Sequence, residues 1–102
     1  MHSVSLIELI AAPDRFNGQP VRVIGFLHLE FEGNAVYLSE ADHKHAVTKN
    51  GLWVTFKSGF SKELSDSYVL LEGTFSANNQ GHMGLWSGAI EDITRAERWQ
   101  SR

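Results

Sequence analysis

The stretch PVRVIGFLHLEF, residues 20–31, decides the fold that we expect for this chain. Its apolar side chains alternate, so that Val21, Val23 and Leu27 fall on one face of a long extended strand. Gly25 interrupts this apolar row at its centre, and a glycine in so long a strand often marks a bend or a bulge. A strand that bends at Gly25 can serve two sides of one barrel.

The sequence around this strand predicts four further strands. Glu32-Gly33-Asn34 is a turn signal, and a return strand over 35–38 makes a hairpin with the first strand. Later strands are expected over 52–56, 68–76 and 83–93, and Gly73 lies in the middle of the second of these. The polar stretch 58–67, between the strands expected over 52–56 and 68–76, is expected to be a loop or a short helix.

Three short helical segments are also expected. Ser5 stands three residues before Glu8, which is the spacing of a capping box, and the apolar residues after Ser5 fall on one helical face. Ser39 followed by Asp42 predicts a helical turn through residue 46. Thr94 predicts the start of a short C-terminal helix that carries the tryptophan at position 99.

The order of a helix, three strands, a connector and two strands resembles the OB-fold, a five-stranded and partly open barrel. The resemblance covers roughly residues 18–93. Three motifs carry it and look like the tRNA-anticodon-binding-like branch: Gly18-x-x-Val21-x-Val23-x-Gly25, Val69-x-Leu71-Glu72-Gly73 and the glycine-rich last strand. We therefore predict a mostly β fold, a five-stranded OB-like barrel with a short N-terminal and a short C-terminal helix, as a single domain over 1–102. An SH3-like barrel is the alternative architecture.

The composition is that of an ordinary globular domain, with 102 residues of which 42% are hydrophobic and 21% charged. The absence of cysteine excludes disulfides, thiolate catalysis and zinc–thiolate sites. The start of the chain lacks a signal-peptide pattern, and no apolar run is long enough to cross a bilayer. We expect a cytoplasmic protein without a membrane partner, although a periplasmic protein whose signal had been removed would look the same.

The net charge of −3 makes nucleic acid a less expected partner, because a phosphate backbone is usually held by a basic face. The one basic cluster is the C-terminal tail, with Arg95, Arg98 and Arg102.

The sequence also lacks the motifs of common enzyme classes. It contains no G-x-S-x-G, no phosphate-binding glycine loop and no G-x-G-x-x-G. Glu91 and Asp92 are adjacent on an expected strand and point to opposite faces, so they do not form an acid–base pair. We predict a protein without enzymatic activity, catalytic residues or cofactor.

His28, Glu30 and Glu32 alternate along one strand, and their side chains share a face on which nitrogen and oxygen ligands could hold a metal ion. A solvated polar face explains the same pattern. We favour it, and predict no metal, because no further residue completes a ligand set. His43 and His45 are expected in an exposed polar connector.

Two aromatic residues are candidates for an exposed surface. Leu52, Val54 and Phe56 supply an inward row, which leaves Trp53 pointing outward, and Phe26 has the opposite parity to the apolar row of its strand. If both are exposed, they form an apolar patch that suits a partner. If they are covered, we expect them under the N-terminal helix.

The leading functional hypothesis is a domain that binds another protein. A small acidic domain of this kind resembles bacterial immunity proteins, which plug a cognate toxin, and the resemblance implies electrostatic steering toward a basic toxin cleft. The alternative is a binder of single-stranded nucleic acid or oligosaccharide that uses the barrel face. The predicted partner-binding residues are Phe26, Glu30, Glu32, Glu40, Asp42 and Trp53.

Overall fold

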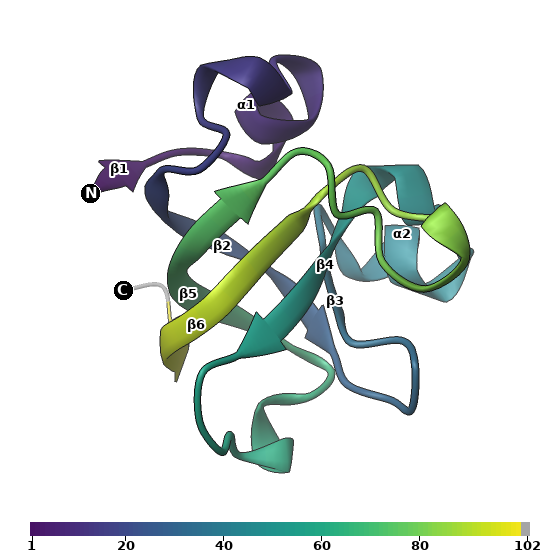
Figure 1. The fold of residues 1–102 in the computed structure, drawn as a ribbon. Helices are drawn as coiled ribbons and strands as arrows, with labels where there is room; N and C mark the ends of the chain where they lie inside the picture. The colour runs from purple at the N-terminus through teal and green to yellow at the C-terminus, as the bar shows by residue number, and fades with distance from the viewer. Residues whose placement is uncertain (101–102) are drawn as a thin grey trace.

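The protein forms a closed β-barrel in the computed structural model, which describes residues 1–100; Arg102 of the basic tail lies outside the described residues. Within residues 1–100, six strands form one sheet in the order β1-β2-β3-β4-β6-β5, and a further pairing of β2 with β5 closes the barrel (Figure 1). The strands are β1 (His2–Ser3), β2 (Pro20–His28), β3 (Ala35–Tyr37), β4 (Gly51–Phe56), β5 (Ser67–Ser76) and β6 (Ala89–Arg98).

The pairing of the strands is that of an OB-like barrel. β2 pairs antiparallel with β3, and β3 pairs antiparallel with β4. β6 then lies between β4, to which it is parallel, and β5, to which it is antiparallel. The antiparallel pairing of β5 with β2 completes the circle. The mostly β fold class with a five-stranded barrel is therefore confirmed, and β1 is an extra strand that runs parallel to β2.

The two glycines that were expected to bend strands lie where the barrel turns. β2 pairs with β5 along most of its length but with β3 only over residues 26–28, just after Gly25. A Cβ atom on Gly25 would lie 2.7 Å from a side-chain carbon of Val36 and 2.9 Å from one of Leu6, so the interior has no room for it. The register between β5 and β6 shifts across Gly73, as a bulge requires.

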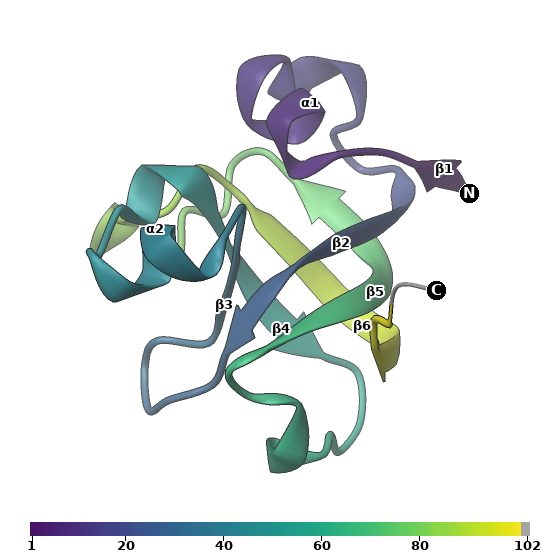
Figure 2. The same ribbon diagram turned by 180° about the vertical axis from the view of Figure 1, so that it is seen from behind.

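Helix α1 (Leu6–Ala11) lies over one end of the barrel (Figure 2). Its predicted capping box is confirmed, because the Ser5 hydroxyl accepts from the Glu8 N–H and the Glu8 carboxylate accepts from the Ser5 N–H, both at 3.1 Å. Leu6 and Leu9 are buried in the core. Among residues 1–100, no helix is long and apolar enough to span a membrane. Buried residues that join α1 to the barrel include Phe16, Val21, Val23, Leu27, Val36, Leu52, Val54, Val69, Leu71, Phe75, Ile90 and Ile93.

The second helix, α2 (Glu40–Lys44), lies in the connection between β3 and β4 and begins at the predicted cap, Ser39, whose hydroxyl accepts from the Asp42 N–H at 3.2 Å. The expected C-terminal helix is wrong. Residues 94–98 continue β6 and pair with β5, where Ala96 lies opposite Leu71. Strand pairing overrides the local cap signal at Thr94, because β5 is long enough to offer hydrogen-bond partners to the backbone of this segment.

The last strand also begins later than its sequence suggested. The segment 82–84 forms a single 3₁₀ turn, η4, and β6 begins at Ala89. The reason is local backbone conformation, since Gly81, Met83 and Gly84 all have positive φ angles, which an extended strand does not permit.

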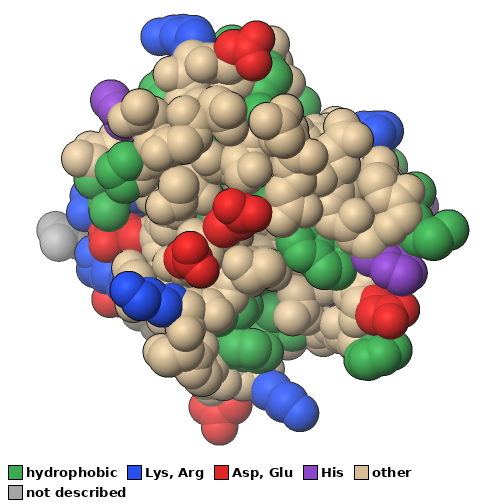
Figure 3. Space-filling model, in the orientation of Figure 1, with side chains coloured by type: hydrophobic (Ala, Val, Ile, Leu, Met, Phe, Trp, Pro, Cys, Tyr) green, Lys and Arg blue, Asp and Glu red, His purple; other side chains and the backbone are tan. Residues whose placement is uncertain are grey.

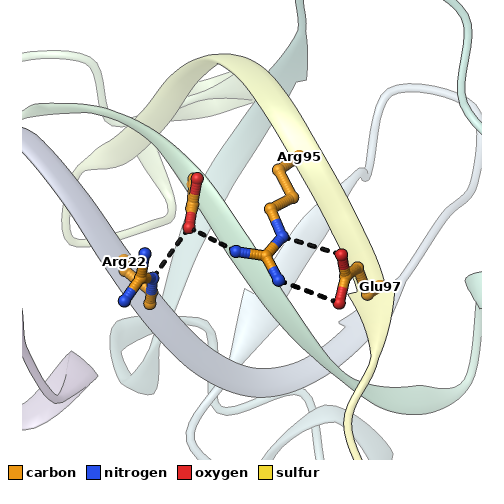
Figure 4. A network of polar contacts seen from close by, with 4 residues as sticks. Arg22, Arg95 and Glu97 are labelled. Carbon is orange, nitrogen blue, oxygen red and sulfur yellow. Dashed lines mark hydrogen bonds and ion pairs between the residues drawn. The ribbon is translucent and has the colours of Figure 1, made fainter.

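A charged network lies on the outer face of β2, β5 and β6 (Figure 4). One oxygen of the Glu72 carboxylate accepts from Arg22 at 2.7 Å and from Arg95 at 2.9 Å, and Arg95 also binds Glu97 at 2.7 Å. The hydrogen bond from Arg22, with a further contribution from Arg95, lowers the pKa of Glu72 below the ordinary value of a carboxyl group.

Candidate functional site

Phe26 points out of the barrel, as its parity predicted, and of the two alternatives, exposed or covered, the structure shows the covered one. Its side chain is 3% exposed. The ring packs at 5.4 Å from the ring of Tyr68 and at 5.8 Å from that of His43 on α2. Phe26 is therefore covered from the side of α2, and not by the N-terminal helix that the alternative interpretation placed over it.

Trp53 also points outward but is half-buried, because the loop between β5 and β6, residues 77–88, folds over it. The ring of Trp86 from this loop packs at 5.0 Å from the ring of Trp53. A Cβ atom on Gly81 would lie 2.6 Å from the Trp53 ring, and Gly81 has a φ of 73°, so both space and conformation require glycine there.

Hydrogen bonds hold this covering loop against β3 and β4. The indole N–H of Trp86 donates to the Tyr37 hydroxyl at 3.4 Å, and the Ser87 hydroxyl donates to the Lys49 carbonyl at 2.7 Å. Burial raises the pKa of the Tyr37 hydroxyl above its ordinary value, and the bond from Trp86 opposes this rise. The outer face of β3 and β4 is therefore filled by the protein's own aromatic side chains.

The tips of two loops meet beside this covered face. His82 from the β5–β6 loop lies 3.4 Å from the Glu32 carboxylate of the β2–β3 loop. On either side of this contact the side chain of Phe31 is 90% exposed and that of Met83 is 78% exposed. Figure 3 shows a histidine and an acidic side chain between hydrophobic groups at the right-hand edge of the molecule. We call this the loop-tip surface; it consists of Phe31, Glu32, His82, Met83 and Leu85.

The backbone of both loop tips is strained. Glu32 has a φ of 56° and Met83 a φ of 62°, in the left-handed region that residues other than glycine seldom adopt. Such conformations cost on the order of 1–3 kcal/mol each and persist where the surrounding structure imposes them. Of these two strained residues, Met83 itself presents an exposed apolar side chain, and Glu32 directly follows the exposed Phe31.

The acidic candidates play different parts. Glu30, Glu32 and Glu40 are exposed. The Asp42 carboxylate instead accepts from the Ser39 hydroxyl at 2.9 Å and from the Asn50 amide at 3.2 Å, so it stabilises the start of α2 and the segment after it.

A histidine cluster lies where β2, the β2–β3 loop and α2 meet. The Nδ1 atom of His28 lies 2.6 Å from the Asp66 carboxylate, and its Nε2 atom lies 3.1 Å from Glu30. The ring of His43 stacks on the ring of His28 with centroids 4.0 Å apart. His28, Glu30, His43 and Asp66 form what we call the histidine cluster.

This cluster differs from the set that strand alternation suggested. Glu32 turns toward His82, and His43 takes its place beside His28 and Glu30. His43 could not be recognised from the sequence as the residue that completes the set, because it lies on a short helix whose position depends on tertiary packing. The cap at Ser39 predicted the helix, but nothing in the local sequence indicated the strand against which it would lie.

The residue types of the cluster suit transition metals. The ligating atoms of His28, Glu30 and His43 all lie within 4.8 Å of one another. Imidazole nitrogens and a carboxylate oxygen are common ligands of zinc and related divalent ions.

A scan against models of protein families found no match for this chain, and a search of curated proteins found none either. The structure itself gives the class of protein. It is an OB-like barrel in which the β5–β6 loop covers the outer face of β3 and β4, and the tips of the β2–β3 and β5–β6 loops are in contact.

Proposed function

We propose that this protein is a non-enzymatic domain that recognises another protein through the loop-tip surface. The observation that carries the proposal is the pair of exposed apolar side chains, Phe31 and Met83, on two loops that are tied together by Glu32 and His82. Large apolar side chains that gather at one place on a surface favour burial against a partner.

The covered barrel face supports a protein partner over a nucleic acid. A ligand of the tRNA-anticodon-binding-like branch would be expected on the open face, where exposed aromatic rings stack bases. Here Tyr37 and Trp53 pack against Trp86 instead. The net charge of −3 adds no attraction for a phosphate backbone.

The loop-tip surface also indicates the chemistry of the partner. Its apolar residues lie beside the exposed carboxylates of Glu30 and Glu32, so the complementary surface is an apolar pocket with a basic rim. An immunity-type inhibitor that approaches the basic cleft of a toxin is the specific form of this proposal, since such charges would speed association.

The first experiment asks whether this surface touches a partner. A photo-crosslinking amino acid is placed at position 83, and at position 7 as the matched control, because Ile7 is an apolar residue on α1 that is 62% exposed. We expect position 83 to crosslink one specific protein in lysate of the native host and position 7 not to do so. Equal crosslinking from both positions would count against the proposal.

The second experiment measures affinity with the purified partner. Phe31→Ser and Met83→Ser should each weaken binding by about 30-fold, which corresponds to roughly 2 kcal/mol. Ile7→Ser should change the affinity less than about threefold. Binding of single-stranded oligonucleotides that weakens steeply with salt, together with no effect of the two loop substitutions, would instead support the nucleic-acid alternative.

A further inference from the structure

We propose that the histidine cluster is a binding site for a divalent transition-metal ion such as Zn²⁺. His28, Glu30 and His43 would be the protein ligands, and Asp66 would orient the ring of His28. This site shares Glu30 with the acidic side chains beside the loop-tip surface, but it does not depend on the exposed apolar side chains, and it is tested without the partner.

The spacing of two of the ligands is close to the one that a bound ion requires. Zinc lies about 2.0–2.2 Å from nitrogen and oxygen ligands, so two atoms bound to one tetrahedral ion are separated by about 3.3–3.6 Å. The Nε2 atom of His28 and the carboxylate oxygen of Glu30 are 3.1 Å apart, so a bound ion would move them only slightly.

The two ring nitrogens of His28 have different partners. Nδ1 lies 2.6 Å from the Asp66 oxygen, so Asp66 occupies this nitrogen as a hydrogen-bond partner. Nε2 faces the Glu30 carboxylate and is the nitrogen through which His28 would bind a metal ion.

The role of Asp66 is the one that carboxylates play behind metal-binding histidines. A ligating histidine usually donates its other N–H to a carboxylate or a carbonyl, which fixes the orientation of the ring and makes the ligating nitrogen more basic. Asp66 lies directly before β5, so His28 is held by residues on two sides: Asp66 at Nδ1 and Glu30 at Nε2.

His43 is the ligand that must adjust. Its ring lies nearly parallel to that of His28, at an interplanar angle of 29°, whereas a metal lies in the plane of each imidazole that binds it. A turn of the His43 ring within the 4.8 Å span of the cluster would direct a nitrogen toward the ion. Three protein ligands leave a further position for water, as in open zinc sites.

The test uses the full chain without a purification tag, and the probes are Zn²⁺ and Co²⁺. We expect one equivalent of Zn²⁺ to bind in calorimetry and to raise the melting temperature, since an ion that binds only the folded state stabilises it. The visible spectrum of bound Co²⁺ should report nitrogen and oxygen ligands.

Single substitutions separate the roles of the residues. His28→Ala, His43→Ala and Glu30→Gln should abolish the rise in melting temperature or weaken the Zn²⁺ affinity by at least about 10-fold, and Asp66→Asn should weaken it by about 10- to 100-fold. The matched controls are His45→Ala, at the end of α2, and His82→Ala, and both should bind as the unchanged protein does.

Two results would overturn the proposal. One is the absence of binding to the unchanged protein at millimolar Zn²⁺, which would leave the contact of His28 with Glu30 as a polar contact only. The other is binding that persists in His28→Ala and His43→Ala. Because substitution of His43 can disturb the packing on Phe26, nuclear magnetic resonance of the imidazole nitrogens in the unchanged protein supplies an independent reading. Only the signals of His28 and His43 should shift with Zn²⁺.

Discussion

At the scale of single residues, Gly81 determines whether the β5–β6 loop can lie against Trp53. Gly81 has a φ of 73°, and a Cβ atom there would clash with the Trp53 ring, whereas Gly84 has a φ of 66° and a Cβ atom there would meet open space. We expect Gly81→Ala to lower the free energy of unfolding by about 2–4 kcal/mol, since it adds a steric clash to backbone strain.

Gly84→Ala is the matched control for this prediction, because it carries the strain without the clash. It should cost about 1 kcal/mol. Urea denaturation measures both values, and equal losses in the two variants would show that the contact with Trp53 does not limit residue 81.

Met83 is a residue at which glycine should improve stability. Its backbone is left-handed and its side chain is almost fully exposed, so Met83→Gly removes strain while it removes little buried area. We expect the free energy of unfolding to rise by up to about 1 kcal/mol in urea denaturation. A clear fall in stability would contradict the prediction.

At the scale of elements, α1 acts through its buried face. Leu9 is fully buried in the core whereas Ile7, on the same helix, faces solvent. Leu9→Ala should lower the free energy of unfolding by about 2–5 kcal/mol, because it leaves a cavity at the end of the barrel. Ile7→Ala should change it by no more than about 0.5 kcal/mol in the same denaturation experiment. Similar effects of the two would mean that α1 does not close the core.

The pairing of β5 with its neighbours should respond to acid through Glu72. Because Arg22 and Arg95 lower the pKa of the folded-state carboxyl, its contribution to stability is present above the ordinary pKa and is lost as the pH falls through the lowered value. Glu72→Gln should therefore be less stable than the unchanged protein near pH 7, and the difference should shrink between about pH 5 and pH 2. Parallel stability profiles over this range would contradict the assignment.

Local signals predicted the elements that local interactions decide. The capping box at Ser5 and Glu8 and the glycine bends at Gly25 and Gly73 are all present. The helix expected from Thr94 is absent because β5 extends far enough to pair with that segment. The length of a strand ladder depends on residues distant in the chain, and a pattern of a few residues carries no information about it.

At the scale of the whole molecule, the same distinction separates the predictable part of the site from the rest. Alternation along β2 correctly placed Phe26 and His28 on its outer face, but exposure depends on what packs there. Helix α2 brings His43 onto that face, which both buries Phe26 and supplies the missing member of the histidine cluster. The packing of α2 on β2 therefore explains both why Phe26 is covered and why His28 has a histidine partner that the sequence did not indicate.

The folded-back loop has a further consequence for what can reach β3 and β4. Trp86 is a tethered occupant of the face on which OB-folds commonly hold oligonucleotides and sugars. A free ligand would have to displace a competitor that is present at an effective concentration on the order of millimolar or more. A weak ligand would therefore compete poorly with Trp86 for this face of the barrel.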